Sequence, residues 1–191
     1  MRHASRLRLH LAYILMMSDI SAFLTVATLQ NASLWRRFGA FVHELLFLVA
    51  YLFIIGLMFA SLSGESMTAG RPQVLTGPIA IFQQAYLFLS VGAYFIYFWT
   101  NGRRTLAFKT WQLKLAAIDG GIVDAKHAII RYLATWIGPV LGLTMFMLIG
   151  TQGSAWWIFG LFANFLWAFA DPGRQFLHDR IAGTRVVTAS S

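Results

Sequence analysis

An ionisable residue, Glu44, interrupts a long apolar run that extends from Phe38 to Leu62. If this run is a helix that enters a membrane, Glu44 lies about 9 Å below its start, at roughly 1.5 Å of rise per residue. An ionised carboxylate at that depth is costly unless it is paired, hydrated or protonated. Three interpretations therefore stay open for Glu44: a structural ion pair, a role in the passage of an ion or substrate, or hydration by a local water defect.

Three more charged or titratable residues are candidates for the same site. Arg37 stands seven positions before Glu44, two turns along the same helix face. Arg131 enters another apolar run from the same side at a similar depth, so we predict an ion pair between Glu44 and Arg131. His43 faces about 100° away from Glu44 around the helix. It is either a proton relay or a polar group packed between helices.

Ionisable residues also gather in the tail, where His178 and Asp179 are adjacent. Two ligands side by side are too few for a metal site. Asp179 next to Arg180 and near Arg174 favours a salt-bridge cluster instead. The sequence has no cysteine and no hydrolase, zinc-protease or phosphate-loop motif. We therefore expect no catalytic residue, no metal site and no cofactor, and we expect the protein not to be an enzyme.

Membrane helices are the elements that must position these side chains. The sequence is 58% hydrophobic and only 12% charged, whereas soluble domains hold about 25% charged residues. Four segments approach the roughly 20 apolar residues that a membrane helix needs. They are Phe38–Leu62, Ile79–Trp99, Ala128–Ile149 and Ala155–Ala170, the last reaching bilayer length when it is extended back to Thr151.

These runs predict an all-α integral membrane protein, a bundle of four transmembrane helices. Gly138 and Pro139 predict a kink in the third helix, because proline removes a backbone donor. The amides of Gln83, Gln84 and Asn164 predict hydrogen bonds between helices, with a polar substrate path as the alternative.

The basic residues are distributed unevenly between the loops. Of fifteen, five precede the first run, five lie between the second and third runs and three lie in the tail. This asymmetry predicts a multi-pass protein of the bacterial inner membrane with both termini in the cytoplasm. The net charge of +8 then suits anionic lipid headgroups rather than nucleic acid.

Two segments outside the helices have patterns of their own. Trp111 to Leu115 alternates apolar and polar residues, and Thr184 to Val187 is a candidate partner strand. Together they predict a small cytoplasmic β-ribbon, with Asp124 as the N-cap of the third helix. Residues 1–33 are expected to form a cytoplasmic or interfacial extension, with a signal or anchor segment or a natural start at Met17 as alternatives. Residues 34–191 are expected to form the transmembrane domain.

The order and spacing of these segments resemble the RDD family of bacterial membrane proteins. The family is named for an arginine at the start of its first helix, an aspartate within that helix and a second aspartate. Arg37, Glu44 and Asp179 stand at the corresponding places here. Glu44 keeps the charge of the usual aspartate but lengthens the side chain by one methylene, which a pairing role tolerates better than tight ion coordination does.

Two other motifs carry the resemblance. The segment from Thr100 to Lys109 is similar to the family's Thr-x-Gly-x-Thr-x-Gly-Lys pattern, with Ala107 in place of a glycine, and the tail is the closest match. The matching residues are Gly102, Thr105 and Lys109 in the loop, Arg131 at the start of the third helix, and His178, Asp179, Arg180, Gly183 and Thr184 in the tail. The resemblance implies a membrane protein for which transport of ions or small solutes is the usual suggestion.

Two functions therefore compete at this point. The first is transport, in a homo-oligomer because four helices enclose little polar volume. The second is a non-catalytic scaffold whose basic cytoplasmic face docks a membrane protein partner. A lipid-modifying enzyme is a weaker third hypothesis, because no nucleophile stands with a base.

Overall fold

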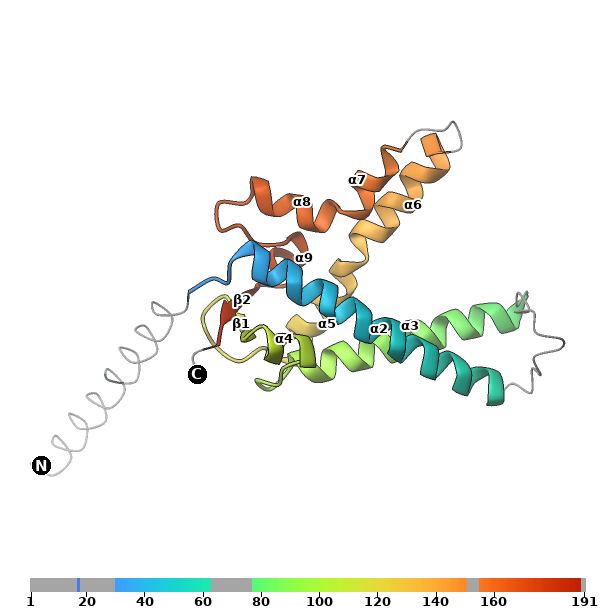
Figure 1. Cartoon of the computed structure of the whole chain (residues 1–191), viewed down its shortest axis with the longest axis horizontal. Helices are drawn as coiled ribbons and strands as arrows, with labels where there is room; N and C mark the ends of the chain where they lie inside the picture. The colour runs from blue at the N-terminus through green and yellow to red at the C-terminus, as the bar shows by residue number, and fades with distance from the viewer. Residues whose placement is uncertain (1–16, 18–29, 63–76, 151–154, 190–191) are drawn as a thin grey trace, which may run out of the picture.

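The computed structural model describes residues 17, 30–62, 77–150 and 155–189. Within these ranges the chain is mostly helical, with one small sheet (Figure 1). The elements in chain order are α2 (Leu34–Leu62), α3 (Pro78–Trp99), α4 (Leu106–Thr110), β1 (Leu113–Ala117), α5 (Ala125–Thr135), α6 (Ile137–Ile149), α7 (Trp157–Leu161), α8 (Ala163–Ala170), α9 (Leu177–Ile181) and β2 (Thr184–Thr188).

Three helical segments are long and apolar enough to cross a membrane. They are α2 with 29 residues, α3 with 22 residues, and α5 with α6, which together form a stretch of 25 residues. A crossing needs about 20 residues, so each segment suffices. These segments confirm three of the expected spans, and the protein has the character of a membrane protein.

The expected fourth transmembrane helix is not confirmed. Residues 157–170 fold as two short helices, α7 and α8, with Phe162 between them. Figure 1 shows α7 beside α6, whereas α8 turns across the molecule toward α9. Gly160 and Gly142 allow the close contact of α7 with α6, since a Cβ on Gly160 would stand 2.8 Å from the Gly142 backbone. The extension back to Thr151 lies outside the described residues.

The third span is interrupted near Pro139, as the sequence predicted. The interruption lies at Trp136, three residues before the proline. Helix α5 ends at Thr135 and α6 begins at Ile137. Pro139 has no N–H for the Thr135 carbonyl, which lies one helical turn earlier. Asn164 supplies the missing donor from α8, because its amide nitrogen donates to the Thr135 carbonyl at 2.9 Å. This contact confirms the interhelical hydrogen bond predicted for Asn164.

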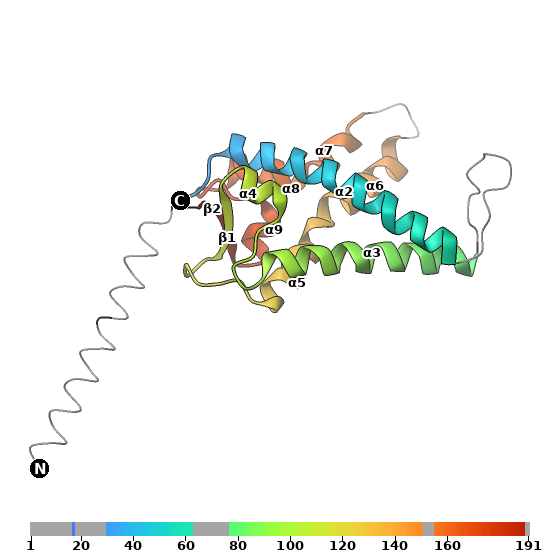
Figure 2. The same ribbon diagram turned by 60° about the horizontal axis from the view of Figure 1, so that its bottom comes forward.

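A compact unit covers one end of the long helices. It consists of residues 30–33, α4, β1, α9 and β2, and we call it the polar cap. Strands β1 and β2 pair antiparallel, with Leu115 opposite Val186, which confirms the predicted ribbon, although β1 begins two residues later than predicted because Trp111 and Gln112 form a turn after α4. Asp124 caps α5 by accepting the His127 N–H, as the sequence predicted. In Figures 1 and 2 the cap lies where α2 begins, α3 ends and α5 begins, together with α4 and α9. The fold therefore carries the loop and tail motifs to the same end of the helices.

The chain also enters the cap from its N-terminal side. Asn31 forms a β-bridge with Val187, and the Ala32 N–H donates to the Val186 carbonyl at 3.1 Å. The described residues 30–33 thus include contacts with β2. Apart from these and Met17, the segment of residues 1–33 and the predictions made for it lie outside the described residues.

Candidate functional site

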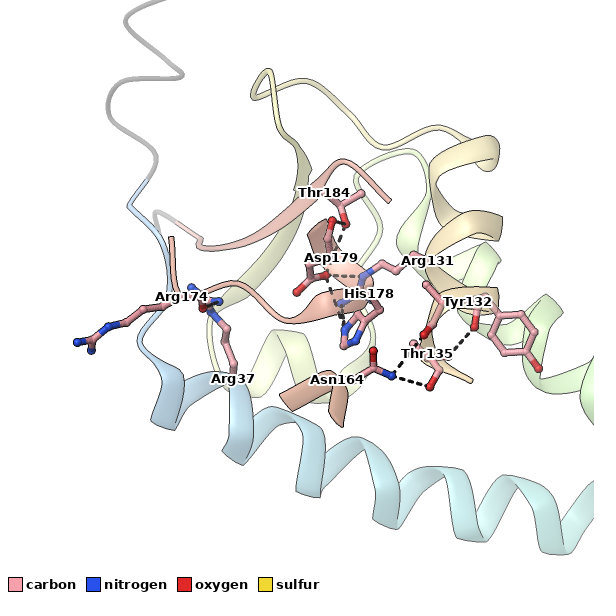
Figure 3. Close-up of polar contacts among 10 residues, drawn as sticks. Arg37, Arg131, Tyr132, Thr135, Asn164, Arg174, His178, Asp179 and Thr184 are labelled. Atoms are coloured by element: carbon pink, nitrogen blue, oxygen red, sulfur yellow. Dashed lines mark hydrogen bonds and ion pairs between the residues drawn. The ribbon is translucent and has the colours of Figure 1, made fainter. Parts of the chain in front are cut away.

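A buried ion pair joins the third span to the polar cap. The Arg131 Nε donates to Asp179 Oδ1 at 2.7 Å, and both side chains are buried. Figure 3 shows Arg131 extending from α5 to α9, where Asp179 and His178 are adjacent. The Thr184 hydroxyl at the start of β2 donates to the Asp179 carbonyl at 3.4 Å. The tail motif therefore folds back to place an acid against the membrane-helix arginine.

The environment keeps Asp179 ionised. Burial alone raises the pKa of the Asp179 carboxyl, but the positive charge of Arg131, with a smaller contribution from Arg37, lowers it below its usual value. The pair thus consists of a carboxylate and a guanidinium, which interact strongly where water is excluded. Removing either partner leaves the other charge buried and uncompensated.

His178 takes part in the same cluster as a neutral ring. Its Nε2 lies 3.4 Å from an Arg131 terminal nitrogen, which has only N–H donors, so Nε2 accepts and Nδ1 carries the proton. Burial lowers the pKa of His178 to about 4, with Asp179 opposing and Arg131 adding to that effect. The Arg131 guanidinium also lies over the Trp99 ring, 4.1 Å from its centroid.

Arg37 approaches this cluster from the first turn of α2. Its side chain is buried and donates to the Arg174 carbonyl at 2.8 Å, while its guanidinium lies 5.9 Å from the Phe176 ring centroid. The charge of Arg37 acts on Asp179 across the cluster. Arg37 and Asp179, two of the three residues that carry the family resemblance, therefore belong to the same cluster. We call Arg37, Arg131, His178 and Asp179 the buried charge cluster.

Glu44 lies two turns further along α2 and has a different partner from the one predicted. One carboxylate oxygen accepts from the Tyr94 hydroxyl at 3.0 Å, and the other has no partner among the described residues. The ion pair predicted between Glu44 and Arg131 is not formed there, because α9 brings Asp179 to Arg131 instead. Sequence spacing gave no signal for Tyr94, which sits in the uncharged second span.

A cavity of about 330 Å³ connects Glu44 to the buried charge cluster. Helices α2, α3, α5 and α8 surround it. Its polar lining consists mainly of Arg37, Glu44, Arg131, Asn164 and His178, and most of the remaining wall is aromatic or aliphatic. Glu44 and Arg131 thus face one cavity without pairing. A cavity with apolar walls and a few converging polar groups is the usual form of a small-molecule site.

Several predicted site residues do not line this cavity. His43 stacks on Phe47 of the same helix at a centroid distance of 4.9 Å. Thr105 caps α4 by accepting the Phe108 N–H, Gly102 has a positive φ of 71°, and Lys109 is exposed. These loop residues therefore shape the polar cap.

The rest of the tail motif is structural as well. Arg180 faces solvent and approaches Asp171 at 3.6 Å, rather than forming the cluster predicted around Asp179. Asp171 also accepts the Gln175 N–H, which fixes the turn that leads into α9. Gly183 has a φ of 61° before β2, a conformation that favours glycine.

Comparison with known proteins gives one result that bears on identity. Neither the curated proteins nor the solved structures contained a match. The model of the RDD family matches residues 31–183, which begin at the β-bridge of Asn31 and end beside β2. This match covers well over half of the 191 residues, and it includes every residue of the buried charge cluster. The chain belongs to the RDD family.

Proposed function

We propose that the protein moves an ion or a small polar solute across the membrane, using the cavity as its binding site. One observation carries this proposal: Glu44, on a helix long enough to span the bilayer, lines the cavity, and one of its buried carboxylate oxygens has no hydrogen-bond partner among the described residues. A buried acid without a full set of partners is costly in a membrane helix. Ionisable residues inside membrane helices mark ion and substrate paths in many membrane proteins.

The surrounding groups support a binding role. Arg131 is held by Asp179, and Arg37 is held by the Arg174 carbonyl, so both guanidinium groups are fixed before any solute arrives. Fixed polar groups in a largely apolar cavity bind without first rearranging. The aromatic side chains around them, including Trp99 and Tyr132, form part of the cavity wall and offer ring faces to a cation.

The proposed orientation places the polar cap in the cytoplasm of a bacterium, with the helices in its inner membrane. The distribution of basic residues supports it, since thirteen of the fifteen flank the cap side of the predicted spans. In this arrangement α6 carries the chain away from the cap, and α7 and α8 return it as a fourth, broken crossing. Both termini then lie on the cytoplasmic side, from which a solute reaches the cavity.

Glu44→Gln is expected to reduce transport about 10- to 100-fold. The substitution keeps the size of the side chain but removes the charge, and a hydrogen bond to a charged group contributes roughly 1.5–3 kcal/mol. The measurement is proton- or sodium-coupled flux, and flux of small polar solutes, into proteoliposomes that contain the purified protein.

His43→Gln serves as the matched control, because His43 is the adjacent residue and does not line the cavity. It should retain the wild-type rate. If the wild-type protein gives no more flux than empty liposomes across a broad panel of ions and solutes, the transport proposal is wrong. Equal transport rates for wild type and Glu44→Gln would show that Glu44 takes no part in transport.

A further inference from the structure

We infer that the solute is a zwitterion that carries a primary ammonium at one end and an oxyanion at the other. This inference rests on the proposed function, since it takes the cavity as the solute site. It follows from four buried polar atoms of cavity-lining residues that have no hydrogen-bond partner among the described residues. They are Glu44 Oε2, Asn164 Oδ1, Arg37 Nε and His178 Nδ1.

Two of these atoms require a donor. Glu44 Oε2 belongs to a carboxylate whose other oxygen is already bonded to Tyr94. Asn164 Oδ1 is fixed as an oxygen because the amide nitrogen of the same side chain donates to the Thr135 and Ala134 carbonyls. Both side chains are more than nine-tenths buried. An ammonium group with N–H donors satisfies such acceptors, and a quaternary ammonium does not.

The other two atoms require an acceptor. Arg37 Nε is a donor under all conditions, and its guanidinium is anchored through a different nitrogen to the Arg174 carbonyl. His178 Nδ1 carries the ring proton because Nε2 faces the Arg131 guanidinium. Both side chains are more than nine-tenths buried. A carboxylate or phosphate oxygen is the group that accepts from a guanidinium most strongly.

The two charged side chains of this set, Arg37 and Glu44, are separated along the cavity. Arg37 and Glu44 are seven residues apart on α2, which corresponds to about 10 Å along the helix axis. His178 lies in the cap with Arg37, while Phe41, between Arg37 and Glu44 on α2, is part of the wall. This spacing suits a solute whose charges stand at opposite ends, with the oxyanion toward the cap and the ammonium deeper.

The charge balance of the site favours the same class of solute. Two guanidinium groups, Arg37 and Arg131, face two carboxylates, Glu44 and Asp179, so the formal charges cancel. Taking a lone cation or anion into a cavity with this balance leaves an uncompensated charge in a medium of low dielectric constant. A zwitterion adds one charge of each sign and preserves the balance.

The same chemistry exists in a free solute and in a lipid headgroup, since phosphatidylethanolamine joins a primary ammonium to a phosphate. Binding to the detergent-purified protein is therefore measured with ε-aminocaproate and with O-phosphoethanolamine, using tryptophan fluorescence, because Trp99 and Trp136 line the cavity. Caproate and pentylammonium carry one charge each and serve as single-charge controls. A second arm compares the protein in nanodiscs of phosphatidylethanolamine with the protein in nanodiscs of phosphatidylcholine, which has no N–H.

At least one zwitterion is expected to bind about tenfold or more tightly than either single-charge analogue. Glu44→Gln and Arg37→Gln should each weaken that binding about tenfold or more, whereas His43→Gln and Arg36→Gln should not change it. Arg36 is the matched control for Arg37, because it bonds to the Trp111 carbonyl and does not line the cavity. A spectral change confined to phosphatidylethanolamine nanodiscs, and lost in Glu44→Gln, assigns the site to a lipid headgroup.

The inference is overturned if the single-charge analogues bind as tightly as the zwitterions, or if neither arm shows binding that depends on Glu44. Glu44→Gln keeps the side-chain volume, so its result stands even if Arg37→Gln does not fold. The two proposals fail separately. Ion flux that depends on Glu44 without zwitterion binding removes only this inference, and zwitterion binding without flux of any solute removes only transport.

Discussion

Asp179→Asn is expected to lower the free energy of unfolding by about 3–5 kcal/mol, which is typical for breaking a buried ion pair by removing one partner. The asparagine keeps the shape of the aspartate, so the loss comes from charge. Arg131 would remain a cation, buried and over the Trp99 ring, with no carboxylate at 2.7 Å. The measurement is denaturant or SDS unfolding in mixed micelles, followed by circular dichroism.

Asp119→Asn is the matched control for this prediction. Asp119 is exposed in the turn after β1, where it accepts the Gly121 N–H, and its replacement should cost well under half as much. Replacing both partners, Arg131→Met with Asp179→Leu, should recover most of the stability, because no charge is then left unpaired. Equal losses for Asp179→Asn and Asp119→Asn would contradict the assignment of the buried pair.

Asn164→Leu is expected to cost about 1–3 kcal/mol, because it leaves a partly buried carbonyl without a donor. The carbonyl is that of Thr135, which receives the Asn164 amide at 2.9 Å and which Pro139 cannot serve. Pro139→Ala restores an N–H one turn after Thr135. In the Pro139→Ala background the cost of Asn164→Leu should therefore fall to less than half.

A double-mutant cycle in the same unfolding assay measures this coupling. Gln84→Leu is the control, since Gln84 is an exposed amide on α3 and replacing it should be close to neutral in both backgrounds. Strictly additive costs for Asn164→Leu and Pro139→Ala would mean that the amide does not replace the missing backbone donor.

Local patterns in the sequence predicted the parts of the fold that depend on neighbouring residues. Apolar runs located α2, α3 and the third span, and alternation located β1. Asp124 was recognisable as a helix cap because its partner, the His127 N–H, is three residues away. Each of these features is determined by residues that are close together in the sequence.

Long-range contacts could not be derived in this way. Arg131 and Asp179 are 48 residues apart, and Glu44 and Tyr94 are 50 apart. Depth in the membrane suggested pairing Glu44 with Arg131, but depth does not say which acid a folded tail brings to an arginine. The family resemblance identified Asp179 as a notable residue without identifying its partner.

The break between α7 and α8 was missed for a related reason. A hydropathy profile reports only how apolar a segment is. It gives no sign that Asn164 donates a hydrogen bond to the Thr135 carbonyl at the break in the third span. An amide at membrane depth was the one available signal, and it was interpreted correctly as an interhelical contact. Its consequence, that α8 must turn toward the third span, required the position of Pro139 in three dimensions.

The central claim is that the cavity between the helices takes up polar solutes from the side of the polar cap. Cysteine accessibility tests it most directly, because the chain contains no cysteine of its own. Ala40→Cys introduces a thiol on the cavity wall, and Leu46→Cys introduces one on the outer face of the same helix, where Leu46 is 67% exposed and surrounded by apolar residues. We expect a charged, membrane-impermeant thiol reagent, applied to membranes from the cap side, to modify Ala40→Cys and to leave Leu46→Cys unmodified. An Ala40→Cys thiol that stays as unreactive as Leu46→Cys would show a dry, closed helix interface and would contradict the claim.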